Sequence, residues 1–413
     1  MEEKRIVIVG AGFGGLTVAL TLARDPVIAN RGYEIVLIDR QTHHLYTAGL
    51  YEVAAVPRGF AKDTYLASSV RIPISDIIRA VPIRFVRGAL AELDIRNRRI
   101  TLSNGGTLPY GFLILALGAE TNYFDIPGLK EYSMPLKTAD DAIALRNAIE
   151  RRAASTASLT IVIGGAGATG VELAAELINF LCALEREKRD AVLVCRTTVM
   201  LLEASGEILP GFSARAVRQI TKRLRYLGVI IKAGVPIIAA GKSDITLRTG
   251  ERISYDILVW TGGIKGPQIL KSLGLSLSSQ GTLVVDQALR VPQSDGRIFA
   301  VGDNAWLAHP RTKKPLPATA YVAEQEARHT AYAISRALRK KSVRRFRPMK
   351  KYPFVLAVGR KYAWADIVTV RVAGLTGWCI KQLIQLKYFL FILPWPQAIA
   401  LWWRNVRLYH SND

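Results

Sequence analysis

The stretch IVIVGAGFGG, residues 6–15, is a buried-strand pattern that runs into glycines at positions 10, 12 and 15. This is the G-x-G-x-x-G spacing, and the following residues, 16–24, predict a helix. In such a unit Gly10 permits the tight turn, Gly12 lets a pyrophosphate approach bare backbone, and Gly15 lets the helix pack on the strand. A second predicted strand, residues 34–38, ends at Asp39, whose carboxylate can accept hydrogen bonds from a ribose 2′-hydroxyl. The stretch therefore predicts a dinucleotide site.

The same arrangement recurs later in the chain. An apolar strand at 159–163 precedes the glycines Gly165, Gly167 and Gly170, and a predicted helix follows at 171–184. The next strand, 199–202, ends at Glu203 after a longer gap, which the charged residues 185–190 and an extra apolar segment at 191–195 can fill. Glu203 would repel a 2′-phosphate, so NADH is favoured over NADPH. Two fingerprints imply two dinucleotides, and this favours an enzyme that passes a hydride between cofactors.

Two further strands end in small residues and resemble each other. Residues 110–119 reach Gly118, and residues 255–263 have the same form. Such paired junctions suit a chain that leaves one domain and later re-enters it. A last predicted strand at 297–301 is followed by Gly302 and Asp303. Asp303 is a candidate site residue, and the alternative is that it lies in a solvated turn.

The charge of the chain is strongly basic. Its 413 residues are 50% hydrophobic and include 56 Lys+Arg against 33 Asp+Glu, a net charge of +23. This predicts an anionic partner, either nucleic acid or a membrane surface. Residues 328–361 hold twelve Lys/Arg and no acid, and a tryptophan-rich apolar tail follows. Because few aromatics interleave with these charges, we expect the anionic surface of a membrane and no nucleic acid.

The tail is expected to lie on a membrane rather than cross it. Its longest apolar run, 388–403, contains two prolines and is shorter than the ~20 residues that a spanning helix needs. Leu375, Cys379, Leu383, Leu386 and Leu390 share one predicted helix face, with Lys381 and Gln385 opposite, and a short helix is expected after Pro396. The alternative for this face is a homodimer interface, which could coexist with the anchor.

The chain resembles a known family. The two fingerprints, ALG at 116–118 and VGD at 301–303 resemble the two-dinucleotide-binding-domain flavoproteins. Within them it is similar to the type II NADH dehydrogenases, the single-chain NADH:quinone oxidoreductases. The stretches that narrow the match are HLY at 44–46, LYEVA at 50–54, TNYF at 121–124 before IPG at 126–128, and LAVGR at 356–360.

The resemblance implies an α/β fold with two Rossmann-like domains and a C-terminal amphipathic helical region that associates with a membrane. The FAD-binding domain would span 1–118 and 260–330, the NADH-binding domain 119–259, and the membrane-association region 331–413. FAD would contact Asp39 and Asp303, and NADH would contact Glu203. Glu172 would lie near the junction of nicotinamide and flavin and handle protons there. Its alternative is an acid that complements a helix dipole.

The acceptor site departs from the family pattern. The family shows A-Q-x-x-x-Q at the quinone mouth, whereas residues 320–325 read AYVAEQ. Tyr321 therefore replaces the first glutamine and Gln325 keeps the second, one helical turn away on the same face. The alternative for Tyr321 is a core aromatic.

The expected enzyme is an FAD-dependent NADH:quinone oxidoreductase on the cytoplasmic face of the cell membrane, without spanning helices and therefore without proton pumping. The three cysteines form no CxxxxC pair, which disfavours dithiol chemistry, and no metal is expected, because His43 and His44 lack acids at ligand spacing. Two alternatives stay open: a soluble, ferredoxin-reductase-like NADH:acceptor reductase with the same cofactors, and a redox-inactive protein that senses nucleotides.

Overall fold

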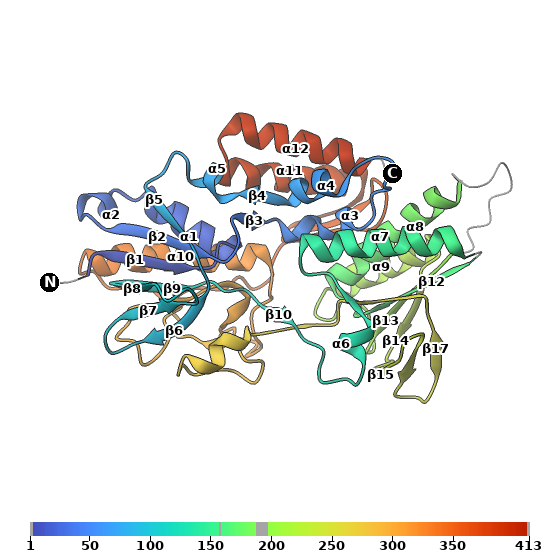
Figure 1. The fold of residues 1–413 in the computed structure, drawn as a ribbon, viewed down its shortest axis with the longest axis horizontal. Coiled ribbons are helices and arrows are strands. Elements are labelled where there is room, and N and C mark those ends of the chain that lie inside the picture. The colour runs from blue at the N-terminus through green and yellow to red at the C-terminus, as the bar shows by residue number, and fades with distance from the viewer. Residues whose placement is uncertain (1–2, 157, 187–196, 411–413) are drawn as a thin grey trace. The chain divides into compact units, whose positions relative to one another are not determined.

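The computed structural model describes residues 3–156, 158–186 and 197–410 (Figure 1). The chain divides into two compact units, each assembled from separate stretches of sequence. Unit 1 contains residues 1–44, 72–120 and 264–350, and unit 2 contains residues 45–71, 121–263 and 351–413. The predicted segment 191–195 lies outside the described residues.

Unit 1 is built on a five-stranded parallel sheet. The apolar stretch at 5–9 forms its middle strand because every side chain from Ile6 to Val9 is buried, as expected for a parallel sheet covered on both faces. The sheet order is β21 (Ile298–Ala300), β9 (Phe112–Leu115), β1 (Arg5–Val9), β2 (Glu34–Asp39) and β5 (Ile83–Arg87). Its helices are α1 (Phe13–Ala23), α2 (Pro26–Asn30), α5 (Ile74–Ile78) and α10 (Ala320–Leu338). Helices α1 and α10 pack against each other.

Unit 2 repeats this architecture. Its parallel sheet has the order β11 (Met134–Pro135), β18 (Ile257–Trp260), β12 (Leu159–Gly164), β13 (Thr197–Glu203) and β14 (Ile230–Ala233). Helices α7 (Ala139–Ser155), α8 (Ala168–Arg186) and α9 (Ala214–Tyr226) belong to this unit. In each unit the strand that precedes the fingerprint pairs with the strand that ends in the predicted acid. The predicted α/β fold with two Rossmann-like domains is confirmed.

Each unit also carries a small antiparallel sheet. In unit 1 it consists of β6 (Leu90–Asp94), β7 (Arg99–Leu102) and β8 (Thr107–Pro109), and in unit 2 of β15 (Ile237–Ala240), β16 (Asp244–Leu247) and β17 (Arg252–Ser254). The shorter elements are β3 (His43–Leu45), α3 (Leu50–Val53), α4 (Asp63–Val70), β4 (Arg71–Pro73), β10 (Glu120–Thr121), α6 (Leu129–Tyr132), β19 (Ile264–Lys265), β20 (Leu283–Val284) and β22 (Ala305–Trp306).

The C-terminal part of unit 2 forms an antiparallel sheet followed by two helices. The sheet contains β23 (Phe354–Ala357), β24 (Ala363–Ile367) and β25 (Val370–Gly374), and the helices are α11 (Leu375–Ile392) and α12 (Trp395–His410). The prediction of a short helix after Pro396 is wrong, because α12 begins one residue earlier and is four turns long; a helix tolerates proline in its first turn. In the described part of the chain, no helix is both long and apolar enough to cross a membrane.

The units differ from the predicted domains in two places. The chain passes between units after Glu120 and after Gly263, close to the predicted boundaries at 118 and 260. Residues 45–71, however, belong to unit 2 rather than to the first domain. The predicted C-terminal region is also divided, because residues 331–350 pack in unit 1 through α10 and the segment after it.

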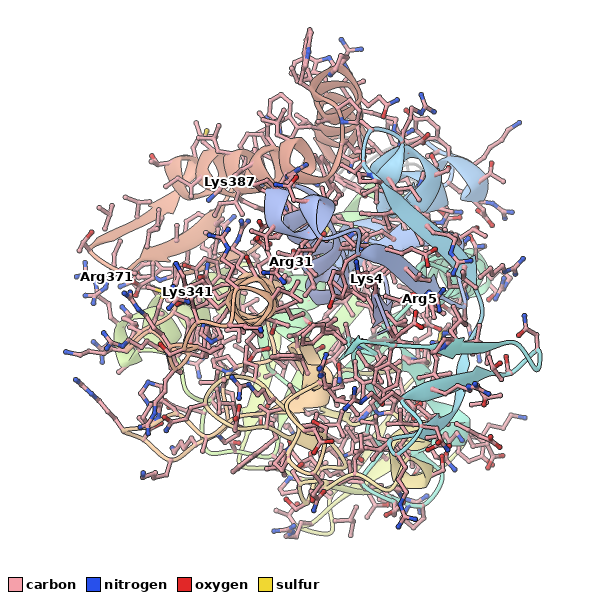
Figure 2. The ribbon with its side chains drawn as sticks, turned by 90° about the vertical axis from the view of Figure 1, so that its left-hand side faces the viewer. Lys4, Arg5, Arg31, Lys341, Arg371 and Lys387 are labelled. Carbon is pink, nitrogen blue, oxygen red and sulfur yellow. The ribbon has the colours of Figure 1, made fainter. Side chains whose placement is uncertain are left out.

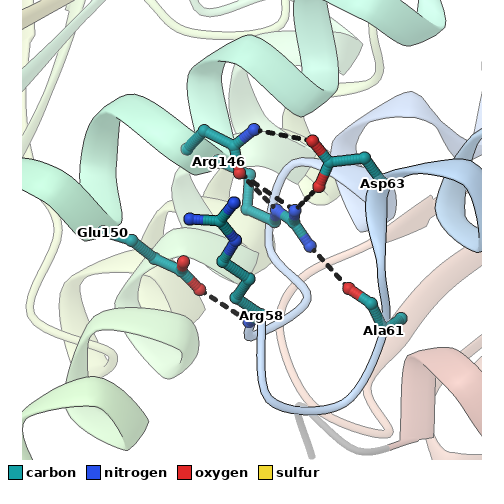
Figure 3. A network of polar contacts seen from close by, with 6 residues as sticks. Arg58, Ala61, Asp63, Arg146 and Glu150 are labelled. Atoms are coloured by element: carbon teal, nitrogen blue, oxygen red, sulfur yellow. Dashed lines mark hydrogen bonds and ion pairs between the residues drawn. The ribbon is translucent and has the colours of Figure 1, made fainter.

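A buried arginine fixes the inserted segment 45–71 inside unit 2 (Figure 3). The guanidinium of Arg146, on α7, is inaccessible to solvent and donates to the Asp63 carboxylate and, at 3.0 Å, to the carbonyl oxygen of Ala61. Asn147 donates to the second Asp63 oxygen at 3.0 Å, and the backbone N–H of Arg58 donates to Glu150 at 2.6 Å. These bonds hold residues 58–63 on α7. A buried charge of this kind depends on its partner.

We expect Asp63→Ala to lower the free energy of unfolding by about 3 kcal/mol, because it leaves a buried guanidinium without its counter-charge. The matched control is Glu251→Ala, which removes the acid of the solvent-accessible pair with Lys232 and should change stability by about 0.5 kcal/mol. Urea unfolding of both variants measures the difference. Equal losses in the two variants would contradict a special role for the network.

Candidate functional site

The first fingerprint turn is closed by the acid at the end of the next strand. The Asp39 carboxylate accepts a hydrogen bond from the backbone N–H of Ala11 at 2.7 Å and from that of Gln41 at 2.8 Å. The N–H of Gly10 donates to the carbonyl oxygen of Ile38 at 2.7 Å. A carboxylate has about four acceptor positions, so Asp39 retains capacity for a ribose hydroxyl.

The second turn has the same construction. Glu203, 9% exposed, accepts from the N–H of Ala166 and from that of Ser205, both at 2.8 Å, and Gly165 donates to Leu202 at 2.8 Å. The predicted acids Asp39 and Glu203 therefore occupy equivalent positions in the two units.

The fingerprint glycines fall into two groups according to what surrounds them. A Cβ on Gly15 would overlap the carbonyl oxygen of Gly10, and one on Gly170 would overlap that of Gly165, so these glycines are required by helix–strand packing. Gly12 and Gly167 are different, because a Cβ there would meet no protein atom within 4 Å. Their bare backbone faces open space, which fits the approach of a pyrophosphate to a helix N-terminus. The turns therefore fit two dinucleotides.

A buried asparagine joins the ends of β9 and β21. Asn304 donates to the carbonyl oxygen of Leu115 at 2.9 Å and accepts from the N–H of Gly118 at 3.3 Å. Gly118 and Gly302 both have positive φ, +70° and +76°, where glycine is favoured. Sequence reasoning found these two glycines but missed Asn304, whose partners are more than 180 residues away.

Gly302 and Asp303 line an open cavity in unit 1. The walls also include Lys265, Thr319 and Glu326, together with apolar residues of α10. The predicted residue Asp303 thus opens into a space that can accept a ligand.

His44 packs against the first fingerprint turn. Its side chain is inaccessible, its Nδ1 lies 2.9 Å from the carbonyl oxygen of Ala11, and its ring meets Phe13 edge-on at 5.2 Å. Burial lowers the pKa of His44 to about 4, so the ring is neutral near pH 7 and Nδ1 carries the donated proton. Among the described residues no cluster of His, Cys, Asp and Glu could hold a metal ion.

Glu172 lies at the start of α8 within a charged cluster of unit 2. It accepts a hydrogen bond from the N–H of Ala357 at 3.2 Å. Burial of its carboxyl group raises the pKa to about 8, although Lys381 and the Ala357 amide oppose the shift. Near pH 7 Glu172 is therefore protonated and can donate.

Two partners of this cluster were not predicted. Glu52 and Lys381 form a partly buried ion pair with 2.5 Å between carboxylate oxygen and Nζ. Burial alone would lower the pKa of Lys381, but Glu52, Glu172 and Glu176 together raise it. Both members of the pair line a small pocket with Glu176, Trp378 and Tyr409. The pair spans 329 positions in sequence, so no local spacing could reveal it.

Tyr321 and Gln325 lie one turn apart on α10 in unit 1, and both side chains are partly exposed. The hydroxyl group of Tyr321 donates to the sulfur of Met349 at 3.4 Å. Tyr321 is therefore not a fully buried core aromatic, and its ring lies between the helix and the segment that follows it.

Two equivalent glycine turns, each bonded to the acid that ends the next strand, are typical of dinucleotide-dependent oxidoreductases of the two-domain class. The sequence profile of the pyridine nucleotide-disulphide oxidoreductase family matches residues 4–327, and the chain belongs to this family. Cys182 is half-buried on α8 and Cys379 is exposed on α11; Cys195 lies outside the described residues.

Relatives and solved structures agree with the predicted resemblance. The chain is 27% identical over 348 residues to the type II NADH:quinone oxidoreductase of Staphylococcus saprophyticus, with 82% of this chain and 83% of the relative covered. Its fold matches NDH2 from Plasmodium falciparum in complex with NADH at a TM-score of 0.83, with 17% identity over 99% of both chains. It also matches the sulfide:quinone oxidoreductase of Aquifex aeolicus at 0.77, with 19% identity, 94% of this chain and 91% of the other. The predicted resemblance to type II NADH dehydrogenases is confirmed.

Proposed function

We propose that this chain is an FAD-dependent, non-proton-pumping NADH:quinone oxidoreductase. The observation that carries the proposal is the duplicated turn, in which Asp39 and Glu203 make the same bonds and Gly12 and Gly167 leave bare backbone open. One chain thus offers two dinucleotide sites, and the curated relatives are type II NADH:quinone oxidoreductases.

The cofactors are FAD and NADH, and we assign FAD to unit 1 and NADH to unit 2. Gly10, Gly12 and Gly15 with Asp39 would hold the adenosine and pyrophosphate of FAD, while Gly118, Gly302 and Asp303 would line the rest of its site. Gly165, Gly167 and Gly170 with Glu203 would hold NADH. When bound, FAD accepts a hydride from NADH and delivers the electrons to a quinone.

Glu172 would supply the proton that is needed in addition to the hydride. Reduction of a quinone by NADH consumes one proton from the medium, since the quinol carries two hydrogens and the hydride brings one. A protonated carboxyl group with a pKa of about 8 can donate that proton at pH 7 and recover it from solvent. Lys381, which pairs with Glu52, places a positive charge near Glu172. This charge stabilises the Glu172 carboxylate after donation.

Tyr321 and Gln325 would lie at the quinone site. The tyrosine offers a hydroxyl group and a flat ring where a glutamine would offer a carbonyl acceptor, so we expect Tyr321 to influence which acceptors react.

Absorbance near 450 nm that bleaches on addition of NADH tests the proposal, followed by steady-state NADH oxidation with a panel of quinones and soluble acceptors. We expect quinones to react best and NADPH to be about 30-fold or more worse than NADH, because Glu203 repels a 2′-phosphate. Tyr321→Gln, measured alongside, should change the ranking of quinones. A purified chain without flavin, or one that reduces only soluble proteins, would overturn the proposal.

Glu172→Gln should lower kcat for quinone reduction about 100-fold at pH 7, since general acid catalysis contributes factors of this order. The wild-type rate should fall as the pH rises through about 8, where Glu172 loses its proton, and the variant should show no such fall. Glu207→Gln, which alters an acid of the same unit outside the cluster, should keep the wild-type profile. A pH profile shared by all three proteins would remove Glu172 from proton delivery.

Helix α11 supports a peripheral attachment to a membrane. Its polar side chains Gln382 and Gln385 are buried, whereas Leu375, Leu383 and Ile384 are 58%, 61% and 48% exposed. Large apolar side chains that are exposed on a helix with buried glutamines suit an apolar surrounding. On α12, Trp395 and Trp403 are also exposed, at 69% and 48%.

Both units also carry exposed cations. Lys387 on α11 and Arg371 on β25 are exposed in unit 2, and in unit 1 Lys341 follows α10 while Arg31 follows α2 (Figure 2). We propose that residues 328–361 and the C-terminal tail bind the anionic cytoplasmic face of the cell membrane, each cation near the surface contributing ~1 kcal/mol. A homodimer through the same tail is compatible with this attachment.

The double variant Leu383→Gln, Ile384→Gln should bind vesicles at least about tenfold more weakly, because two exposed aliphatic side chains no longer enter the lipid. Ile238→Gln is the control, since Ile238 is 44% exposed in unit 2 on β15. Co-sedimentation with vesicles that contain or lack phosphatidylglycerol gives both the apolar and the electrostatic contribution. Unchanged binding of the double variant would exclude α11 from the attachment.

A further inference from the structure

Glu326 is a buried carboxyl group that the reaction outlined above does not use. It lies on α10 in unit 1, and its residue is only 3% exposed. Its Oε2 accepts a hydrogen bond of 2.7 Å from the backbone N–H of Gly302. It also lines the cavity into which Gly302 and Asp303 open. In the described part of the chain no cation pairs with Glu326, and a buried acid in that situation calls for an explanation.

The turn that Glu326 holds is central to the FAD site. Gly302 has a φ of +76°, and a Cβ placed on it would meet Ala323 of α10 at 3.5 Å. On its other side, a Cβ on Gly14 would lie 3.1 Å from Val301. The Gly302 turn therefore packs between α1, the helix that begins within the first fingerprint, and α10. A shift of Gly302 would move both Asp303 and the wall of the phosphate-binding turn.

Asp303 and Lys265 are the charged residues that line the cavity with Glu326. Burial raises the pKa of Glu326, and the negative charge of Asp303 adds to this increase. The hydrogen bond from the Gly302 amide opposes it, and the resulting pKa is about 8. Helix α1, which packs on α10, has no titratable side chain. Lys265 lines the same cavity on β19. A dinucleotide brings a diphosphate with two negative charges, and an ionised Glu326 would oppose it.

We propose that Glu326 is a positioning residue of the FAD site: its carboxyl oxygen holds the Gly302 turn, and FAD binding is coupled to retention of the Glu326 proton. The proposal rests on the assignment of FAD to unit 1. Loss of the proton leaves the hydrogen bond to Gly302 in place but adds a negative charge beside Asp303, so FAD should dissociate more readily.

Coupling of this kind makes FAD affinity depend on pH. Because the negative diphosphate of FAD should raise the pKa of Glu326 above its value of about 8, the dissociation constant should increase roughly fivefold between pH 7 and pH 9. The free carboxyl group ionises first as the pH rises, and this favours the FAD-free form.

The experiment is dilution of the holoenzyme at pH values from 6 to 9, with released FAD measured by its fluorescence. Glu326→Gln keeps an oxygen acceptor for the Gly302 N–H but cannot ionise, so its FAD dissociation constant should stay flat and near the wild-type value at pH 6. Glu326→Ala removes the acceptor and should weaken FAD at least about tenfold at every pH. Glu324→Gln, at a half-exposed acid on the same helix that pairs with Arg328, should keep the wild-type pH dependence.

The outcomes separate the two proposals. If Glu326→Gln follows the wild-type pH curve, or if Glu326→Ala holds FAD as tightly as wild type at pH 7, the inference is overturned. A wild-type chain that binds no FAD would instead overturn the proposed function. If Glu326→Ala loses FAD while Glu326→Gln keeps it, the loss is due to the missing hydrogen bond and not to a general packing effect.

Discussion

Both units depend on one backbone contact, the packing of a helix against the strand before it with no side chain between them. Gly15 touches the carbonyl oxygen of Gly10, and Gly170 touches that of Gly165, so any Cβ would push the helix away. Once the helix lies this close, its first N–H groups point at the space above the turn. The acid of the next strand then has a backbone amide to bind, and Asp39 and Glu203 both bind one. The two nucleotide sites follow from this contact.

The local part of this design could be predicted from the sequence because its residues are close in the chain. Glycine spacing, strand pattern and terminal acid lie within about 40 residues, and each has its own physical reason. The predicted elements were accordingly found, although α1 begins at Phe13 and α8 at Ala168, earlier than their apolar patterns indicate. The helices start earlier because the glycine turn itself forms the first helical residues.

The long-range part could not be predicted. Asn304 binds Leu115 and Gly118, and Lys381 binds Glu52, across 186 to 329 positions of sequence. Nothing in the residues near Lys381 indicates that it turns inward, because a helix with apolar and polar faces fits either orientation. The insertion of 45–71 into unit 2 has the same origin, since the buried Arg146 that holds it is recognised only from its partners in space. Pairings of distant residues, and not the fold class, were what the sequence left open.

The buried acids show why such pairings matter for function. Glu172 in unit 2 and Glu326 in unit 1 both have a pKa raised to about 8, chiefly by burial. Because these pKa values lie above those of the unfolded chain, the stabilisation they contribute is complete below pH 4.5 and is lost as the pH rises to about 8. At neutral pH both positions therefore hold protons against the preference of the unfolded chain. A glutamine or an alanine would avoid that loss of stability, so the presence of an ionisable group at each position is consistent with a use for its proton. In unit 2 the nearby Glu52–Lys381 pair can support release of that proton, whereas in unit 1 the neighbour is Asp303 and the proton is held.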